Sequence, residues 1–267
     1  MDPCIREREK IPELVARATE SYCGKASGSS SVKDNVVGSF DIVTDADERA
    51  QGILIDGLAE LFPDDLIIAE EGREAQLTEA RTWVIDPIDG TLNYKRGTPL
   101  FGTQMALMVD KKPVFSIINL PALGEVYIAD HVKGASMNGV QLKQTASRPL
   151  SECIVSTGDF SRKKVIWRDK HEEIIGAMRD EVARVRMMGA ACTDFAFLAA
   201  GRIDIHLRFA NKLWDFMPGM FLAEMSGTYT DQAMLDETGL LVMSGSRAES
   251  EEFRSKVLSR IDFTGSK

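Results

Sequence analysis

Hydrophobic residues recur along this chain at two different intervals, and each interval predicts one kind of element. Apolar positions three or four residues apart, such as Ile11, Leu14 and Ala18, predict an amphipathic helix over 5–22. Short apolar runs rich in β-branched residues, such as 66–69, predict buried strands instead. The same two patterns predict further helices at 44–63, 167–178, 190–200, 215–225 and 247–258, and further strands at 82–85, 153–156, 182–186, 203–207 and 240–243.

Turn residues separate these elements and indicate how they are organised. Glycine and serine dominate 24–31, which predicts a loop after the first helix. Several strand-like runs between 102 and 137 are divided by turn residues and predict an antiparallel meander, whereas the second half alternates strands with helices. A chain of 267 residues can bury a sizeable core. We expect one layered unit with two halves, an α+β half over 1–145 that carries most of the candidate metal ligands and an α/β half over 146–267.

The formal net charge of −9 limits the partners to be expected. Nucleic acids and anionic membranes require a basic surface, so we expect neither as a partner. An acidic protein that handles an anionic substrate needs a local source of positive charge, such as bound metal ions. No apolar run reaches the roughly 18 residues of a membrane-spanning helix. Residues 1–10 are too charged for a secretory signal, and we therefore expect a cytoplasmic protein.

Cysteine and histidine provide no obvious reactive or metal-binding group. The four cysteines lie far apart in the sequence and form no Cys-x-x-Cys pair, which is typical of reduced thiols rather than of a disulfide framework or a zinc site. None of the three histidines stands at a metal-ligand spacing from another. We therefore expect the chemistry to depend on carboxylates.

The strongest signal for a functional site is the segment 83–91, Trp-Val-Ile-Asp-Pro-Ile-Asp-Gly-Thr. A buried strand delivers two carboxylates, Asp86 and Asp89, three residues apart into a turn that contains proline and glycine. Hard divalent cations prefer such oxygen ligands, and two carboxylates on one turn can share a pair of ions. Gly90 lets the backbone approach an oxyanion closely, and the Gly90 and Thr91 amides would point at a phosphate if they open a helix. For this segment alone, the alternative is an Asx-type turn with solvated acids.

Three other acidic segments strengthen that signal, although each is weak alone. Asp41 and Asp47 stand ahead of a predicted helix, where the alternative for Asp47 is a helix cap. Glu70 and Glu71 follow a predicted strand, where the alternative is a solvated turn. Asp215 precedes a predicted helix that has a proline in its first turn, and in isolation it would be an N-cap residue.

In this order the four segments resemble the signature of the inositol monophosphatase family, the lithium-sensitive magnesium phosphatases, over nearly the whole chain. The segments 186–191 and 198–204 also resemble the substrate-side strand and helix of that family. The resemblance implies an α/β (α+β) fold, a five-layered α-β-α-β-α sandwich of the inositol monophosphatase and fructose-1,6-bisphosphatase type. It also implies a homodimer, two or three Mg²⁺ ions and inhibition by lithium.

The same resemblance implies roles for individual residues. The implied metal ligands are Glu70, Asp86, the Ile88 carbonyl, Asp89 and Asp215, with Asp86 shared between two ions and a third, weaker ion near Glu70 and Glu71. The implied catalytic residues are Asp41, Thr91, Glu70 and Glu71, of which Asp41 and Thr91 match the pair that orients and deprotonates the attacking water. The implied substrate-binding residues are Asp89, Gly90, Thr91, Gly189, Ala190, Ala191, Arg208 and Asp215.

The chain departs from the family pattern at two places. Asp215 is followed by Phe-Met-Pro-Gly where the pattern has small residues, so we expect the packing behind the site to differ. Arg208 stands seven residues before Asp215, where true inositol phosphatases carry a glutamate that binds sugar hydroxyls. Either Arg208 is a surface residue without a ligand role, or its guanidinium binds a carboxylate or second phosphate of a substrate more acidic than inositol phosphate.

These observations predict a magnesium-dependent phosphomonoesterase that hydrolyses a small phosphorylated metabolite, inositol monophosphate-like or a sugar phosphate, by direct attack of a metal-activated water. Within the same superfamily the alternatives are a nucleotide 3′-phosphatase, a fructose bisphosphatase or a histidinol-phosphate phosphatase. An aspartyl-phosphate mechanism is disfavoured, because it uses aspartates two residues apart whereas Asp86 and Asp89 are three apart. A non-catalytic regulatory homologue is disfavoured too, because a binding module needs no water-activating pair.

Overall fold

Two β-sheets of different size form the framework of the protein. The computed structural model describes residues 5–23, 30–32, 42–72, 75–143, 147–161, 164–209 and 212–265. The larger sheet has seven strands in the order β3-β4-β5-β6-β7-β8-β9. They are Leu66–Ala69 (β3), Thr82–Asp89 (β4), Gly102–Val109 (β5), Lys112–Leu120 (β6), Glu125–Asp130 (β7), Gly134–Met137 (β8) and Val140–Gln141 (β9). β3 and β4 are parallel and every later pair is antiparallel, which confirms the predicted meander.

The smaller sheet has five strands in the order β11-β10-β12-β14-β13. They are Ile154–Thr157 (β10), Arg184–Arg186 (β11), Ile205–Phe209 (β12), Tyr229–Thr230 (β13) and Leu240–Ser244 (β14). β10 is parallel to both β11 and β12, and β14 pairs with β12 in the antiparallel sense. The carboxyl ends of the three parallel strands therefore lie at one edge, where the loops that follow them can bring functional side chains together.

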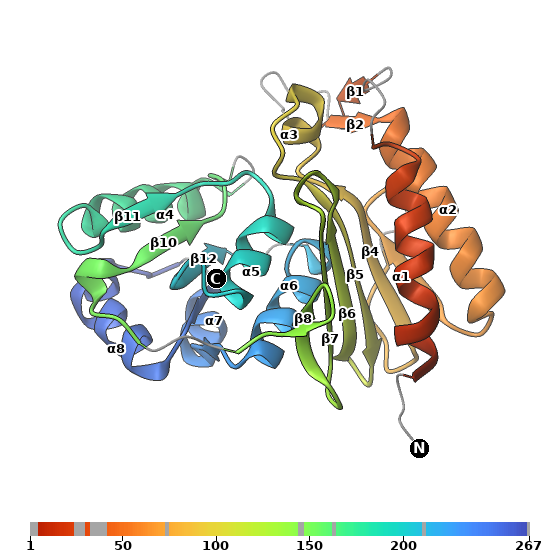
Figure 1. Cartoon of the computed structure of the whole chain (residues 1–267). Helices are drawn as coiled ribbons and strands as arrows, with labels where there is room; N and C mark the ends of the chain where they lie inside the picture. The colour runs from red at the N-terminus through yellow and green to blue at the C-terminus, as the bar shows by residue number, and fades with distance from the viewer. Residues whose placement is uncertain are drawn as a thin grey trace.

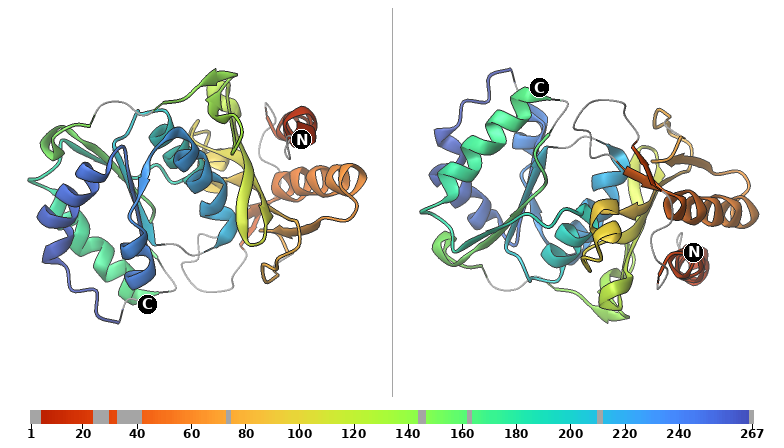
Figure 2. Two further views of the ribbon diagram at one scale, coloured as in Figure 1. Left: turned by 90° about the horizontal axis from the view of Figure 1, so that it is seen from below. Right: turned by 90° about the horizontal axis from the view of Figure 1, so that it is seen from above.

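Helices cover the outer face of each sheet and fill the space between the sheets. They are Ile5–Glu20 (α1), Asp45–Leu61 (α2), Thr91–Arg96 (α3), Val165–Met178 (α4), Ala191–Ala199 (α5), Leu213–Ser226 (α6), Gln232–Thr238 (α7) and Arg247–Lys256 (α8). α1 and α2 cover the larger sheet, α5 and α6 lie between the sheets, and α4, α7 and α8 cover the smaller sheet (Figures 1 and 2). This is the predicted α-β-α-β-α sandwich.

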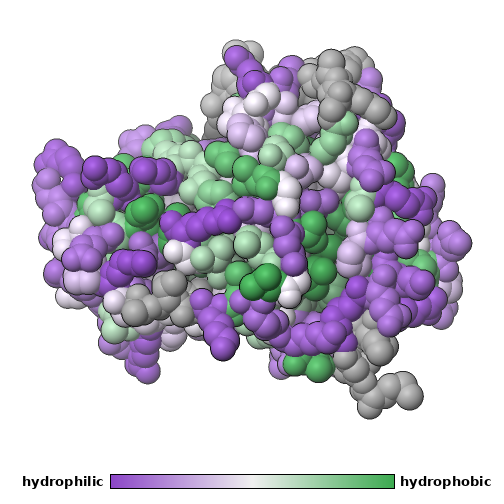
Figure 3. All heavy atoms as spheres, in the orientation of Figure 1, coloured by the Kyte–Doolittle hydropathy of each residue, from purple (hydrophilic) through white to green (hydrophobic). Residues whose placement is uncertain are grey.

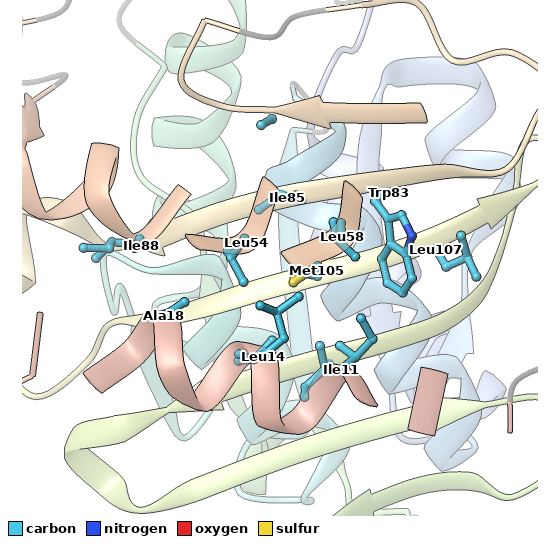
Figure 4. Packing of buried hydrophobic residues seen from close by; sticks show 14 of the residues in the cluster. Ile11, Leu14, Ala18, Leu54, Leu58, Trp83, Ile85, Ile88, Met105 and Leu107 are labelled. Carbon is cyan, nitrogen blue, oxygen red and sulfur yellow. The ribbon is translucent and has the colours of Figure 1, made fainter. Parts of the chain in front are cut away.

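The outer layer of the first half shows why these residues fold as predicted. Leu14 of α1 and Leu54 of α2 are buried, and both lie over the face of the larger sheet that carries Trp83 (Figure 4). A Cβ added at Gly57 would lie 2.3 Å from Leu14 Cδ1, so this glycine allows α1 and α2 to approach closely. Burying such side chains is the main favourable contribution to folding.

The structure differs from the predicted elements at three places. Ser30 and Ser31, predicted in a loop, belong to strand β1 (Ser30–Val32), which pairs with β2 (Ile42–Thr44); residues 24–29 of that loop lie outside the described ranges. α6 begins at Leu213, so Pro218 lies inside the helix rather than in its first turn. α7 was not predicted, although Asp231 accepts a hydrogen bond from the Met234 amide and caps it.

The chain passes from the larger to the smaller sheet between β9 and β10, close to the predicted division at 145 and 146. That division into two halves stays a prediction, because α6 of the second half packs on the larger sheet.

On the face shown in Figure 3, hydrophobic side chains gather in the middle and hydrophilic side chains over both flanks. Cys23, Cys153 and Cys192 are free thiols, as expected, and Cys4 lies outside the described residues. Within the described ranges, no helix is long and apolar enough to span a membrane.

Candidate active site

Asp86 and Asp89 both belong to strand β4, which is longer than predicted. The strand was expected to end at Ile85, but it continues through Asp89 because pairing with β5 resumes after an irregularity. Asp86 pairs with Gln104, and the register then shifts before Asp89 pairs with Gly102. Residues three apart on a regular strand face opposite sides of the sheet, and such a shift can turn them to the same side.

Asp86 is the most strongly perturbed carboxyl group of the predicted metal site. It is 1% exposed, and its Oδ1 atom has no hydrogen-bond partner among the described residues. Burial, followed by the negative charges of Glu70, Asp89 and Asp215, raises the pKa of Asp86 well above its ordinary value. Carboxylates from three separate segments of the chain therefore act on Asp86 in the folded protein.

Glu70 and Glu71 are held at the end of β3 by the sheet and by α2. The Glu70 amide donates to the Ile85 carbonyl at 3.2 Å, which extends the β3–β4 pairing by one residue. The Gln51 side chain makes two hydrogen bonds to the main chain of Glu71, donating from Nε2 to its carbonyl at 2.6 Å and accepting from its amide at 3.0 Å. Gln51 was not recognised in the sequence, because a buried polar residue on a helix has no distinctive local pattern.

Thr91 lies beside Asp47, for which a helix cap was the alternative to a role in the site. Its hydroxyl Oγ1 is 3.2 Å from Asp47 Oδ1 and 3.0 Å from the Ile88 carbonyl oxygen. Asp47 is fully buried in the first turn of α2. Asp41, which was predicted to pair with Thr91, lies outside the described residues. Asp47 is therefore a candidate partner of Thr91 that sequence reasoning did not assign, because its position at the start of a helix also suits a cap.

The N-termini of α3 and α5 converge on Asp89 and Gly90. The Cys192 amide donates a hydrogen bond to Asp89 Oδ2, so this carboxylate caps α5. Burial raises the pKa of Asp89, and the contact with Cys192 and the charge of Arg208 oppose that rise. Gly90 is the N-cap of α3 with a φ of 83°, and a Cβ there would lie 2.8 Å from the Cβ of Ala190. Only glycine fits both requirements.

The predicted substrate-side segment Gly189–Ala191 thus contacts Gly90, which directly follows the predicted metal ligand Asp89. Asn93 of α3 secures this contact, since its Nδ2 donates to the carbonyls of Met188 at 2.8 Å and Leu100 at 2.7 Å. A Cβ at Gly189, whose φ is 72°, would lie 3.2 Å from Asn93 Nδ2. Asn93 was not predicted, because its partners lie on two loops that only the tertiary structure brings together.

A buried chain of hydroxyl groups supports residues 86–89, which contain two of the predicted metal ligands, from the face of the larger sheet that α1 and α2 cover. Thr103 Oγ1 donates to the Pro87 carbonyl at 2.8 Å, so the Tyr22 hydroxyl, 2.8 Å away, donates to Thr103. Tyr94 also donates, to the Tyr22 carbonyl at 3.2 Å. Buried hydroxyls satisfied in this way orient the backbone between Asp86 and Asp89.

Arg208 reaches the same site from the smaller sheet. Its side chain is 15% exposed, which excludes the interpretation of Arg208 as a freely solvated surface residue. Its Nη2 lies 3.6 Å from Asp215 Oδ2, and its Nη1 donates to the Asp215 carbonyl at 3.3 Å. Asp215 lies in the first turn of α6 and is not its N-cap, which is Lys212.

Behind Arg208 lies a buried polar group that the sequence analysis did not identify. Asp194 on α5 is 1% exposed, and burial raises its pKa well above the ordinary value while Arg208 opposes the rise. The His206 ring is fully buried, and its Nδ1 lies 2.7 Å from Ser156 Oγ. Burial and the charge of Arg208 lower the pKa of His206 well below its ordinary value, so this histidine is neutral.

The carboxylate oxygens of the predicted ligands suit a hard divalent cation, although within the described residues they are not arranged around a single position. Among the described residues, no three His, Cys, Asp or Glu side chains stand in a geometry that could hold one ion. Asp89 is bonded to the Cys192 amide and Asp215 to Arg208. Burial and the charges of nearby carboxylates raise the pKa of Asp86, and a divalent cation would offset both effects and provide its Oδ1 with a partner.

The layered fold and the buried carboxylates define an α/β protein with a candidate site for divalent cations and an anionic substrate. Comparison with known proteins identifies its family. A model of the inositol monophosphatase family matches residues 8–261 of the chain. The chain is 34% identical over 202 residues to a Thermotoga maritima protein named fructose-1,6-bisphosphatase/inositol-1-monophosphatase, covering 74% of this chain and 75% of that one.

Two further comparisons agree. The chain is 31% identical over 224 residues to the Nus factor SuhB of Escherichia coli K12, covering 84% of this chain and 81% of that protein. The solved structure of a Thermotoga maritima IMPase superposes with a TM-score of 0.80 at 26% identity, covering 96% of this chain and 100% of that one. The chain belongs to the inositol monophosphatase family, as its motifs indicated. The family and the names of the relatives indicate a phosphatase, without selecting a substrate.

Proposed function

We propose that this protein is a magnesium-dependent phosphomonoesterase that releases phosphate from a small phosphorylated metabolite, inositol monophosphate-like or a sugar phosphate. The observation that carries the proposal is the buried Asp86, whose charge is opposed by three further carboxylates and whose Oδ1 lacks a partner among the described residues. Such an arrangement is unfavourable in an unliganded protein and becomes favourable around divalent cations. A structural role alone would not explain why these acids were brought together.

The proposed metal ligands are Glu70, Asp86, the Ile88 carbonyl, Asp89 and Asp215, with a third, weaker ion near Glu70 and Glu71. When bound, Mg²⁺ would neutralise the charge of the phosphoryl oxygens and of the leaving oxygen. The chain contributes by holding these oxygens in place. Gln51 fixes the main chain at Glu71, and Thr103 fixes the Pro87 carbonyl between the two β4 carboxylates.

We assign the orientation of the attacking water to Thr91 together with Asp47. A hydroxyl has one proton, so Thr91 donates to only one of its two acceptors, Asp47 or the Ile88 carbonyl, at a time. Its oxygen lone pairs remain able to accept a proton from water, and the Asp47 carboxylate can then receive the Thr91 proton. Asp41 stays the competing prediction for this partner, and variants of the two aspartates distinguish them.

The phosphate itself would be held by the amides of Gly90 and Thr91, and the substrate body would lie against Gly189–Ala191. This is supported by the position of Gly90 as the N-cap of α3 and by its contact with Ala190. No nucleophilic side chain is needed, because in-line attack by water requires positioning and charge neutralisation only.

Other phosphatases of the same superfamily remain the nearest alternatives. The relative from Thermotoga maritima carries both fructose bisphosphatase and inositol monophosphatase in its name. Nucleotide 3′-phosphatase and histidinol-phosphate phosphatase activities are the other two. Arg208 favours a substrate with a second anionic group among these, since its guanidinium is largely buried at the site.

A regulatory protein without turnover is the alternative from another class, and the relative named Nus factor SuhB makes it worth testing. Phosphate release separates the two. We expect magnesium-dependent release from at least one of a panel of inositol, sugar, nucleotide and amino-alcohol phosphates, with loss of release in Asp86→Asn. Absence of release across the panel with magnesium present would contradict the phosphatase proposal. The homodimer, the cytoplasmic location and inhibition by lithium stay predictions, to be checked by sedimentation, fractionation and inhibition assays.

A further inference from the structure

The guanidinium of Arg208 contacts both the carboxylate and the main-chain carbonyl of Asp215, a proposed metal ligand. Its Nη2 lies 3.6 Å from Asp215 Oδ2, and its Nη1 donates to the Asp215 carbonyl at 3.3 Å. The arginine side chain is 15% exposed and that of Asp215 is 28% exposed, so the pair is partly shielded from water. In this arrangement the guanidinium supplies the positive charge that a divalent cation would supply at Asp215.

A second carboxylate is available to the same guanidinium. Asp194 on α5 is 1% exposed, its Oδ1 has no hydrogen-bond partner among the described residues, and Arg208 is the cation whose charge stabilises it. The Nε atom of Arg208 is also buried without a partner in the described part of the chain. Arg208 therefore lies near two acids and is bonded to one of them, while both it and the other acid keep unused hydrogen-bonding capacity.

The backbone that follows β10 lies directly against the Arg208 side chain. Residue 158, which directly follows β10, is a glycine, and a Cβ there would lie 3.2 Å from Arg208 Cβ and 3.9 Å from its Nε. A divalent cation at Asp215 would place two positive charges next to the guanidinium. At separations of a few ångströms, in a partly dry site, that repulsion exceeds the strength of one charge-assisted hydrogen bond.

We propose that Arg208 and a divalent cation share Asp215. Arg208 is the counter-ion of Asp215 until the cation binds there, and the guanidinium then passes to Asp194 and to a second anionic group of the substrate, a carboxylate or a phosphate. This inference rests on the proposed function, because it takes Asp215 as a metal ligand. It implies reciprocal coupling, so that magnesium and a doubly anionic ester each strengthen the binding of the other, whereas a neutral sugar ester gains nothing from this exchange.

The first test measures magnesium binding by calorimetry in the absence of any substrate. Arg208→Met should bind Mg²⁺ about fivefold to tenfold more tightly than the wild type, because the ion no longer displaces a charged partner from Asp215. Arg202→Met is the matched control, since it removes an equal charge from a residue bonded to Glu125 rather than to the site, and it should leave Mg²⁺ affinity unchanged.

A double-mutant cycle separates contact exchange from a general field effect. In an Asp215→Asn background, Arg208→Met should no longer change Mg²⁺ affinity. Asp194→Asn should weaken Mg²⁺ binding, because the guanidinium loses the carboxylate that receives it. If Arg208→Met leaves a buried acid without a cation and fails to fold, Arg208→Met combined with Asp194→Asn removes both charges, and should still bind Mg²⁺ more tightly than Asp194→Asn alone.

The second test measures specificity. Arg208→Met should lower kcat/KM for a sugar bisphosphate about tenfold relative to that for a neutral sugar monophosphate. An unchanged Mg²⁺ affinity in Arg208→Met, or an equal gain in the Asp215→Asn background, would overturn the inference while leaving a magnesium-dependent wild-type phosphatase intact. A wild type that binds no Mg²⁺ and hydrolyses no ester would instead overturn the proposed function, and the inference with it.

Discussion

The two sheets contribute acids to one site, but they balance the charge of those acids differently. At the end of the larger sheet, the charges that most affect Asp86 are those of other carboxylates, and they raise its pKa together with burial. Beside the smaller sheet, Asp194 and Asp215 lie near Arg208, and the neighbouring His206 is held neutral. Asp86 is therefore surrounded by like charges, whereas Asp194 and Asp215 lie beside a cation that the chain itself supplies.

The presence or absence of a nearby arginine suits carboxylates to two different functions, metal binding and the indirect binding of a substrate anion. Uncompensated carboxylates destabilise the folded chain and so provide free energy that metal binding can recover. Carboxylates beside an internal arginine bind metal less readily, but they can hold a substrate anion indirectly through that arginine. The contrast predicts that charge removal will have opposite consequences for stability on the two sides.

Asp86→Asn should give the largest effect. Hydrolysis should fall by roughly 10³-fold or more, because several kcal/mol of charge stabilisation in the transition state are lost with the metal. The pKa of Asp86 is raised on folding, so its ionised form costs stability as pH rises above the unfolded value of about 3.9. Without metal at neutral pH, Asp86→Asn should therefore be more stable than the wild type, by about 1 kcal/mol or more in urea unfolding with chelator.

The exposed Asp64, in the turn before β3, provides the control for this substitution. Asp64→Asn should change neither turnover nor the metal-free unfolding free energy. Turnover that survives in Asp86→Asn, or a metal-free variant less stable than the wild type, would contradict the view of Asp86 as an uncompensated metal ligand.

Thr91→Val and Asp47→Asn should each lower kcat by roughly 10²-fold to 10⁴-fold, the usual range for loss of general acid–base assistance. Magnesium affinity should change little, because Thr91 donates its proton rather than binding the ion in this assignment. The double variant should be no slower than the slower single variant, since the two residues act as a unit. A strong effect of Asp41→Asn together with a weak effect of Asp47→Asn would restore the original prediction for the partner of Thr91.

Gly90→Ala tests the close approach of the two sheets' loops at Asp89. Gly90 and Gly97 cap opposite ends of α3 with φ values of 83° and 72°, but only a Cβ at Gly90 would meet other atoms within 4 Å. We expect Gly97→Ala to cost about 1 kcal/mol for the left-handed backbone alone. Gly90→Ala should cost about 1–3 kcal/mol more, measured by urea unfolding, because Ala190 must move. Equal costs would show that the loops are not in tight contact.

A pH titration of stability should give the smallest effect and concerns the smaller sheet. His171 is 3% exposed, bonded to Thr157, and burial lowers its pKa to about 4. The unfolded chain therefore binds the extra proton between about pH 6.5 and pH 4, so the folded state loses stability as pH falls through that range. His171→Gln should reduce the slope of unfolding free energy against pH there, by up to about 1.4 kcal/mol per pH unit. His206 should keep part of the slope in that variant.

Local sequence was sufficient for the order and type of most elements, because each depends on the spacing of its own apolar residues. The α1 stripe of Leu14 and Ala18 and the apolar run that forms β3 needed no distant information. The acidic motifs also identified the family, because several short segments in one order are far more specific than any one of them. The end of β4 was wrong, since its extension to Asp89 depends on pairing with Gly102 of β5.

What remained could be read only from the folded chain, because it consists of contacts between segments that no local pattern connects. Asp47 contacts Thr91 across 44 positions, and Cys192 contacts Asp89 across 103. Whether Arg208 is solvated could not be read from the sequence, and its burial beside Asp215 excluded a freely solvated side chain, whereas its role in substrate binding stays a prediction. A residue's type specifies which interactions it can make, whereas its partners and the water around it determine which of them it does make.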